Sequence, residues 1–178
     1  NGDQAIWFAM LKDGIHNFPA ETYQGAGKFL TGKFVFMMFG LPGAALAMYQ
    51  EARPENKKLV GGILFSAALT SFLTGITEPI EFTFLFAAPV LFVAHAILGA
   101  CMSSLMYVFG VVGNFGSGLI DFLAINWLPM FSNHSAQVIV QIGIGLIFSV
   151  IYFFVFRFLI LKLNLKTPGR EEEEEETK

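Results

Sequence analysis

Two glutamates stand inside one of the most apolar parts of this sequence, in the stretch TGITEPIEF at residues 74–82. Glu78 lies directly before Pro79, and Glu81 shares its face if a helix starts at the proline. A carboxylate accepts hydrogen bonds from two adjacent hydroxyl groups, and a helix break exposes backbone N–H and C=O groups that complete the set. The pattern therefore favours a site for a polyhydroxylated ligand, with Thr77 beside Glu78.

A purely structural role is the alternative for both acids. Glu78 would then cap the following helix, and Glu81 would face an aqueous interface. An acid at membrane depth costs roughly 2.5–3.5 kcal/mol on insertion scales, so one next to a helix break is a functional candidate by default. We therefore favour ligand binding for Glu78 and the structural role for Glu81, while keeping Glu81 among the candidates.

Other polar residues in apolar surroundings are weaker candidates. His95 in LFVAHAILG could contact a sugar or carry a proton, although a lone His in such a run is more often a hydrogen-bonded packing residue. Asn114 and Asp121 flank GNFGSGLID and fit site lining and turn chemistry equally well. Lys33 could reach a ligand or a phosphorylated partner, or serve as a surface anchor. The substrate-binding candidates are Glu78, Thr77, Glu81, His95, Asn114 and Lys33.

Catalytic signatures are missing from the sequence. It contains no phosphate-binding Gly-rich loop, no metal-ligand spacing and no nucleophile–base pair. We therefore predict no catalytic residue, no metal ion and no cofactor, and we expect no nucleic-acid partner. A chain of this kind holds a ligand and moves it.

The elements that position these residues belong to a membrane protein. Of 178 residues, 54% are hydrophobic and only 14% are charged, against about 25% charged residues in soluble domains. Residues 59–156 contain no Lys or Arg, and their only acids are Glu78, Glu81 and Asp121. A water-facing surface cannot be built from such a segment. The predicted fold class is an all-α integral membrane protein, a transport domain with transmembrane helices and re-entrant helical hairpins.

Three parts follow one another along the chain. Residues 1–33 read as a polar loop leading to the first hairpin, 34–161 as the transport body, and 162–178 as a cytoplasmic linker. The linker carries six successive glutamates, a run that repels itself and normally stays solvated. Within the body, Gly40-Leu-Pro42-Gly43 predicts that the segment 34–50 is broken or re-entrant. The opening NGDQAIW lacks an initiator Met and a signal pattern, which we interpret as a fragment without its N-terminal part.

The distribution of Lys and Arg constrains the topology. Basic clusters at 53–58 and 157–170 both belong on the cytoplasmic side. An even number of crossings must then lie between them, but the apolar runs are three: 59–76, 83–112 and 136–161. One piece must therefore enter the membrane and turn back.

In the preferred topology, residues 59–76 descend, TEP forms a tip and 80–94 return to the cytoplasmic side. Residues 96–112 then cross outward, and 136–161 cross back. The run 83–112 would be about 45 Å long as one straight helix, too long for a ~30 Å core. Its possible division points are Pro89, His95 and Gly99.

A second topology stays open. It treats 59–76 and 83–112 as full spans and makes 113–131 a re-entrant crossing. Both arrangements satisfy the parity of the basic clusters, and they differ in whether the run 83–112 is divided.

Several motifs together resemble a known family. FMMFGLPGAALAMYQEARPENKK, GITEPIEF and LKTPGRE look like the C-terminal half of enzyme IIC (EIIC) of the bacterial phosphoenolpyruvate-dependent sugar phosphotransferase system, glucose superfamily. The resemblance covers nearly the whole chain, and GVVGNFGSGLIDFLAINWLPMF looks closer to maltose-type than to glucose-type members. It implies a homodimeric, multi-pass protein of the bacterial cell membrane with a cytoplasmic C-terminus. It also implies that Glu78 contacts sugar hydroxyls and that Thr77 lines the same site.

The resemblance further implies phosphotransferase partners. The linker would lead towards a IIB domain, whose phosphocysteine transfers phosphate to the sugar, and IIA would supply IIB. The chain would thus be part of a protein-Nπ-phosphohistidine–sugar phosphotransferase complex without a phosphoryl-carrying residue of its own. The N-terminal half of the family's membrane domain, which carries the dimerisation scaffold, is missing here.

Three functions follow from these observations. The leading one is a sugar permease subunit that binds and translocates an α-glucoside (maltose) or glucose, with Phe82 or Phe84 available to stack on the sugar. The alternative is a proton- or ion-coupled carrier in which Glu78 or Glu81 titrates. A third is a membrane receptor or scaffold that transports nothing.

Overall fold

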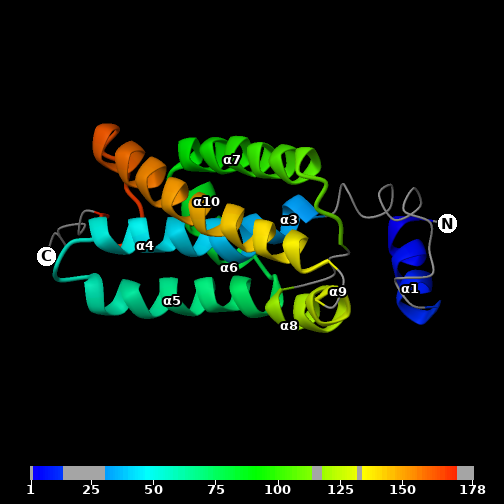
Figure 1. Ribbon diagram of the computed structural model, residues 1–178. Helices are drawn as coiled ribbons and strands as arrows, with labels where there is room; N and C mark the ends of the chain where they lie inside the picture. Colours follow the sequence, from blue (N-terminus) through cyan, green and yellow to red (C-terminus); the bar gives the residue numbers. More distant parts are fainter. Residues whose placement is uncertain (1, 14–30, 114–117, 132–133, 172–178) are drawn as a thin grey trace, which may run out of the picture.

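The computed structural model describes residues 2–13, 31–113, 118–131 and 134–171. All regular elements in these ranges are helical (Figure 1), which confirms the all-α class. The longer helices are α1 (Asp3–Asp13), α4 (Leu41–Glu51), α5 (Lys57–Thr74), α6 (Glu78–Leu85), α7 (Pro89–Val108) and α10 (Ser135–Lys162). The short elements are α3 (Thr31–Val35), η2 (Phe36–Gly40), α8 (Leu119–Phe122), η3 (Leu123–Trp127) and α9 (Leu128–Met130).

Helices α4, α5, α7 and α10 form an elongated bundle, in which α10 packs on α4 and α7, and α4 packs on α5 (Figure 1). Helices α7 and α10 are long and apolar enough to cross a membrane. Large apolar side chains on three helices point outward, among them Leu59, Phe65, Val93, Ile97, Ile147 and Phe154. An outer surface of this kind suits lipid or another protein segment rather than water.

The prediction of a broken segment at 34–50 is wrong. Elements α3, η2 and α4 follow one another as one helical run from Thr31 to Glu51. The run accommodates Pro42 through a π-helical turn in which the Leu41 N–H donates to the Phe36 carbonyl. The Met37 carbonyl loses that N–H and instead accepts a hydrogen bond from the buried Ser71 hydroxyl at 2.7 Å. A partner on another helix thus keeps the run continuous.

The run 83–112 is divided at Pro89, one of the three predicted points. Helix α6 ends at Leu85, and Pro89 occupies the first turn of α7, where its missing N–H costs nothing. Ala88, before the proline, is non-helical with φ −150° and ψ 71°, because proline disfavours the helical conformation in the residue before it. The division contradicts the topology with a single 83–112 span. The predicted return arm, 80–94, is likewise interrupted, because it contains the end of α6 and the start of α7.

The two basic clusters meet at one end of the bundle, as the parity argument requires. The C-terminal part of α10 and the loop between α4 and α5 lie at the same end of the bundle (Figure 1). Arg157 Nε donates to Glu51 Oε1 at 2.7 Å, two residues before the first cluster, and the Arg53 N–H donates to the Gly169 carbonyl at 3.1 Å, which joins the two clusters directly. We call this the basic end of the bundle.

The start of the predicted linker folds onto this basic end. Arg170 donates to the Glu51 carbonyl at 3.2 Å, the Leu165 carbonyl at 3.1 Å and Asn164 Oδ1 at 2.9 Å. Gly169 has φ +80°, and its carbonyl accepts the Arg53 N–H at 3.1 Å. These hydrogen bonds hold the start of the predicted linker, up to Arg170, against the basic end of the bundle.

We expect Arg170→Ala to release this segment. The change removes three hydrogen bonds from a charged group, each worth roughly 1.5–3 kcal/mol. Trypsin should then cleave after Lys166 at least about fivefold faster, because cleavage follows the population of the open segment. Lys162→Ala, which removes an exposed cation from the same end, is the control and should leave that rate unchanged. Equal rates for both variants would show that Arg170 does not hold the segment.

Candidate functional site at the tip of the α5–α6 hairpin

The TEP sequence forms a tight connection between α5 and α6, as predicted. Gly75 ends α5 in the left-handed conformation, with φ +74°, and its N–H donates to the Ser71 carbonyl at 3.0 Å. Thr77 precedes the first turn of α6, and Pro79 lies in that turn. Gly118 approaches the tip so closely that a Cβ there would lie 2.6 Å from the Gly75 nitrogen. A side chain at position 118 would therefore collide with the tip, and only glycine fits there without a shift.

Glu81 is the acid that the bundle surrounds. Its carboxylate Oε1 lies 3.4 Å from His95 Nε2, and its side chain is 19% exposed. The Glu81 N–H donates to the Thr77 carbonyl at 2.9 Å, which keeps Thr77 beside this acid. A carboxylate has two acceptor oxygens, so the contact with His95 leaves acceptor capacity for a ligand.

His95 connects Glu81 to a third helix. The Tyr152 hydroxyl of α10 lies 3.0 Å from His95 Nδ1 and 3.2 Å from the His95 carbonyl oxygen. If the hydroxyl donates to Nδ1, the neutral ring carries its proton on Nε2 and donates it to Glu81. The chain Glu81–His95–Tyr152 therefore ties α6, α7 and α10 together.

Aromatic rings enclose this chain. The rings of Phe36, Phe84 and Phe92 lie 5.2, 5.8 and 6.0 Å from the His95 ring, centroid to centroid. Tyr152 is fully buried, and His95 is buried as well. Exclusion of water strengthens each polar contact in the chain and makes the loss of any one partner costly.

The structure brings some of the predicted residues together and separates others. Thr77, Glu81 and His95 lie together, whereas Lys33 is an exposed residue of α3. Glu78 opens α6 with an exposed side chain, one helical turn from Glu81. Asn114 lies outside the described residues, and Asp121 is half-buried in α8.

One of the two proposed stacking residues is not accessible. The Phe84 ring is fully buried and packs edge-on against the Phe156 ring at 5.3 Å. It serves as the core anchor of α6 and cannot stack on a ligand in this arrangement. Phe82 is 51% exposed and stays the candidate for that contact.

Sequence reasoning missed Tyr152. Its position in the run FSVIYFFVF makes it look like one more apolar packing residue. The signal was its hydroxyl, because a buried Tyr O–H usually finds a hydrogen-bond partner. Among the described residues, no group of three or more His, Cys, Asp or Glu comes close enough to hold a metal ion.

Comparison with known proteins places the chain in a family. The family model described as "Phosphotransferase system, EIIC" matches residues 1–100. The chain is 53% identical, over its whole length, to a "PTS system alpha-glucoside-specific EIICB component" of Leptotrichia buccalis, of which it covers 34%. Over 79% of its length it is 58% identical to a "PTS system maltose-specific EIICB component" of Bacillus subtilis, of which it covers 27%.

A further relative is the "PTS system glucoside-specific EIICBA component" of Staphylococcus carnosus, 51% identical over 99% of this chain and 24% of that protein. The chain thus spans a quarter to a third of the length of these relatives. The family model covers more than half of the chain, and the identities exceed 50% across it. The chain belongs to the EIIC family, the membrane component of the phosphotransferase system.

Proposed function

We propose that this chain is the sugar-binding part of a phosphotransferase permease and that the tip of the α5–α6 hairpin holds the sugar. The observation that carries the proposal is the helix break with two acids one turn apart, of which Glu81 is fixed by His95 and Glu78 is exposed. A fixed and a free carboxylate offer several acceptors to neighbouring hydroxyl groups. Thr77 adds a donor beside them, and Lys33 stays a proposed residue of the same site.

The proposed substrate is an α-glucoside such as maltose, with glucose as the second possibility. The relatives named above carry the words alpha-glucoside, maltose and glucoside in their names. Because these relatives are more than 50% identical to this chain, we propose the same class of sugar for it. Asn114, which lies four residues before Gly118 in the sequence, stays a proposed residue of the same site.

The proposed topology places the basic end, and with it the C-terminus, in the cytoplasm. Helices α5, α6, α7 and α10 then run alternately away from and back to that side, with α6 as the re-entrant return arm (Figure 1). A sugar bound at the tip would be released towards a IIB domain on the cytoplasmic side. The segment after Arg170 is the proposed connection between this chain and IIB. Dimerisation through an N-terminal half stays a prediction.

The experiment that tests the proposal is binding of radiolabelled maltose and glucose to the complete protein, wild type against Glu78→Gln. The change keeps the size of the side chain and removes its charge. Maltose affinity should fall about tenfold, the worth of one hydrogen bond to a charged group. Glu55→Gln, the same change in the exposed loop between α4 and α5, should leave affinity unchanged.

Two results would contradict the proposal. Saturable maltose and glucose binding could be missing from the wild-type protein, which would favour a receptor or scaffold. Uptake could proceed without a phosphoryl donor and collapse a proton gradient, which would favour the coupled carrier. Unchanged affinity in Glu78→Gln would remove Glu78 from the site and leave Glu81 as the acid to test.

A further inference from the structure

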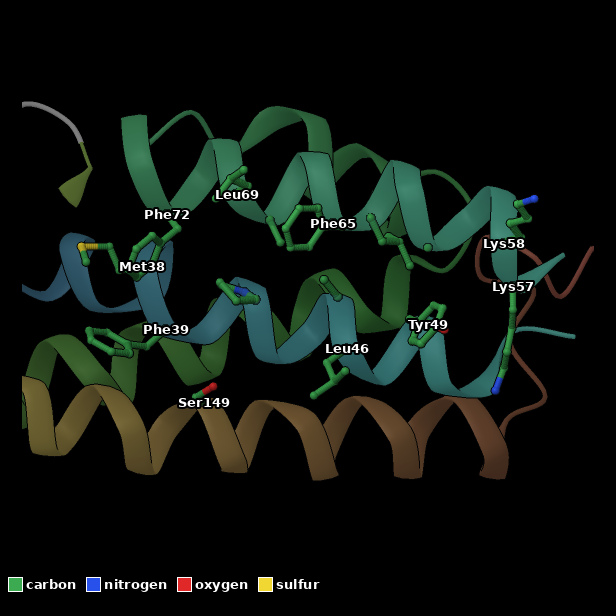
Figure 2. A pocket seen from close by; sticks show the side chains of 15 residues that line it. Met38, Phe39, Leu46, Tyr49, Lys57, Lys58, Phe65, Leu69, Phe72 and Ser149 are labelled. Carbon is green, nitrogen blue, oxygen red and sulfur yellow. The ribbon is translucent and has the colours of Figure 1, made fainter. Parts of the chain in front are cut away.

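An apolar groove of about 810 Å³ runs along α4 and α5, on a part of the surface that the sugar site does not use (Figure 2). Apolar side chains from both helices line it, including Leu46, Phe65, Leu69 and Phe72. Neither Glu81 nor His95 is among its lining residues. Leu46, Phe65 and Leu69 are 56%, 69% and 42% exposed, so the groove needs an apolar occupant.

Charge is confined to one end of this groove. Lys57 and Lys58 lie at that end, where α5 begins, with their side chains pointing to opposite sides, and apolar and aromatic residues occupy the other end (Figure 2). The Lys57 ammonium lies 5.6 Å from the centroid of the Tyr49 ring, which directs it over the mouth of the groove. No carboxylate lines the groove, and the neighbouring Glu51 is already paired with Arg157. The two lysines therefore present positive charge that no acid lining the groove balances.

The groove matches the two halves of an anionic phospholipid. Its long apolar part is suited to an acyl chain, and the Lys57 ammonium over the Tyr49 ring is suited to a phosphate at the membrane surface. The lysines lie at the basic end, which the distribution of Lys and Arg assigns to the cytoplasmic leaflet. Basic pockets between membrane helices on that side bind anionic headgroups. A zwitterionic lipid offers the same chains without net negative charge.

We propose that the α4–α5 groove is a binding site for one anionic phospholipid, with an acyl chain along Leu46 and Phe65 and the phosphate beside Lys57, while Lys58 adds positive charge at the same end. The site is independent of sugar binding and needs only that the protein lies in a membrane. Each lysine contributes about fivefold to the preference for an anionic headgroup.

The test uses the complete protein in vesicles that contain a trace of photoreactive lipid with a diazirine in the acyl chain. Phosphatidylglycerol and phosphatidylcholine with identical chains are the two probes. After irradiation, mass spectrometry of peptides maps the labelled residues. We expect labelling at Leu46, Phe65 or Leu69 that is at least tenfold stronger for phosphatidylglycerol, and that falls with increasing salt.

Variants distinguish headgroup selection by the lysines from acyl-chain binding in the apolar groove. Lys57→Gln/Lys58→Gln should remove most of the preference for phosphatidylglycerol while weak labelling by both lipids persists. Lys162→Gln, at the same basic end but outside the groove, should keep the preference and serves as the matched control. Maltose binding, measured in parallel, reports whether each variant is folded.

Two results would overturn the proposal. Equal labelling by both lipids would make the groove an ordinary lipid-facing surface with no headgroup selection. Strong labelling elsewhere on the protein but none along α4 and α5 would show that another protein segment covers the groove.

Discussion

Glu81→Gln is expected to lower maltose affinity about 100-fold, more than any other single change at the tip. The carboxylate is half-buried and lies 3.4 Å from His95 Nε2, so replacing it with an amide removes two interactions at once. It loses a charged acceptor for sugar hydroxyls, and it weakens the contact that ties α6 to α7. Each loss is worth roughly 1.5–3 kcal/mol, and 1.4 kcal/mol corresponds to tenfold in affinity. Equilibrium binding of labelled maltose to the complete protein measures the effect.

Tyr152→Phe separates positioning from direct contact. The variant keeps the buried ring and removes only the hydroxyl that lies 3.0 Å from His95 Nδ1. Tyr152 acts on Glu81 through His95, so the affinity should fall only about two- to tenfold, as for one neutral hydrogen bond. Unchanged affinity in Glu81→Gln would exclude Glu81 from binding, whatever Glu78→Gln shows. A larger loss in Tyr152→Phe than in Glu81→Gln would mean that the hydroxyl itself touches the sugar.

The hairpin was predictable because its signals are local. Pro79 and Pro89 each lie in the first turn of a helix, a position that proline favours, and Gly75 ends α5. The charge pattern added a global constraint: two basic clusters had to meet at one end, and the hydrogen bond from the Arg53 N–H to the Gly169 carbonyl shows that they do. Neither inference requires knowledge of which helices touch.

The continuous helix through Pro42 was not predictable in this way. Whether Gly-x-Pro-Gly breaks a helix depends on which group donates a hydrogen bond to the carbonyl that has lost its N–H partner. Here Ser71, from the next helix along the chain, donates to the Met37 carbonyl. A pattern within residues 34–50 carries no information about that partner.

The preference for Glu78 over Glu81 as the sugar-binding acid stays a prediction, but the surroundings of Glu81 could not be predicted, for the same kind of reason. Both stand in one short motif, and sequence reasoning preferred Glu78 because it lies at the break. Burial of Glu81 depends on His95 and on the position of α10, which brings Tyr152 behind the imidazole. The identity of the residue behind a histidine is a property of packing, and no spacing in the sequence encodes it.

Gly43→Ala is the second large effect that we expect, and it concerns the core of the bundle. Helices α4 and α10 pack closely at this point: a Cβ on Gly43 would collide with the backbone carbonyl oxygen of Ser149. Backbone cannot move aside as a flexible side chain would, so the helices must separate. Overpacking of this kind costs about 1–3 kcal/mol, against the roughly 1 kcal/mol that alanine gains over glycine within a helix.

The same substitution at Gly62 provides the control, because a Cβ there meets nothing within 4 Å. Gly62→Ala in the interior of α5 should therefore leave the midpoint of thermal unfolding unchanged or raise it, while Gly43→Ala lowers it. If the unfolding midpoint shifts in opposite directions in the two variants, the difference comes from the α4–α10 contact, because the gain in helix propensity is the same at both sites. A rise in the midpoint for both variants would mean that the two helices tolerate a wider separation. Tyr152 of α10 packs close to the same run of helix, because a Cβ built on Gly40 would lie 2.8 Å from its ring. A wider separation of the two helices would therefore also weaken the hydrogen bond between the Tyr152 hydroxyl and His95.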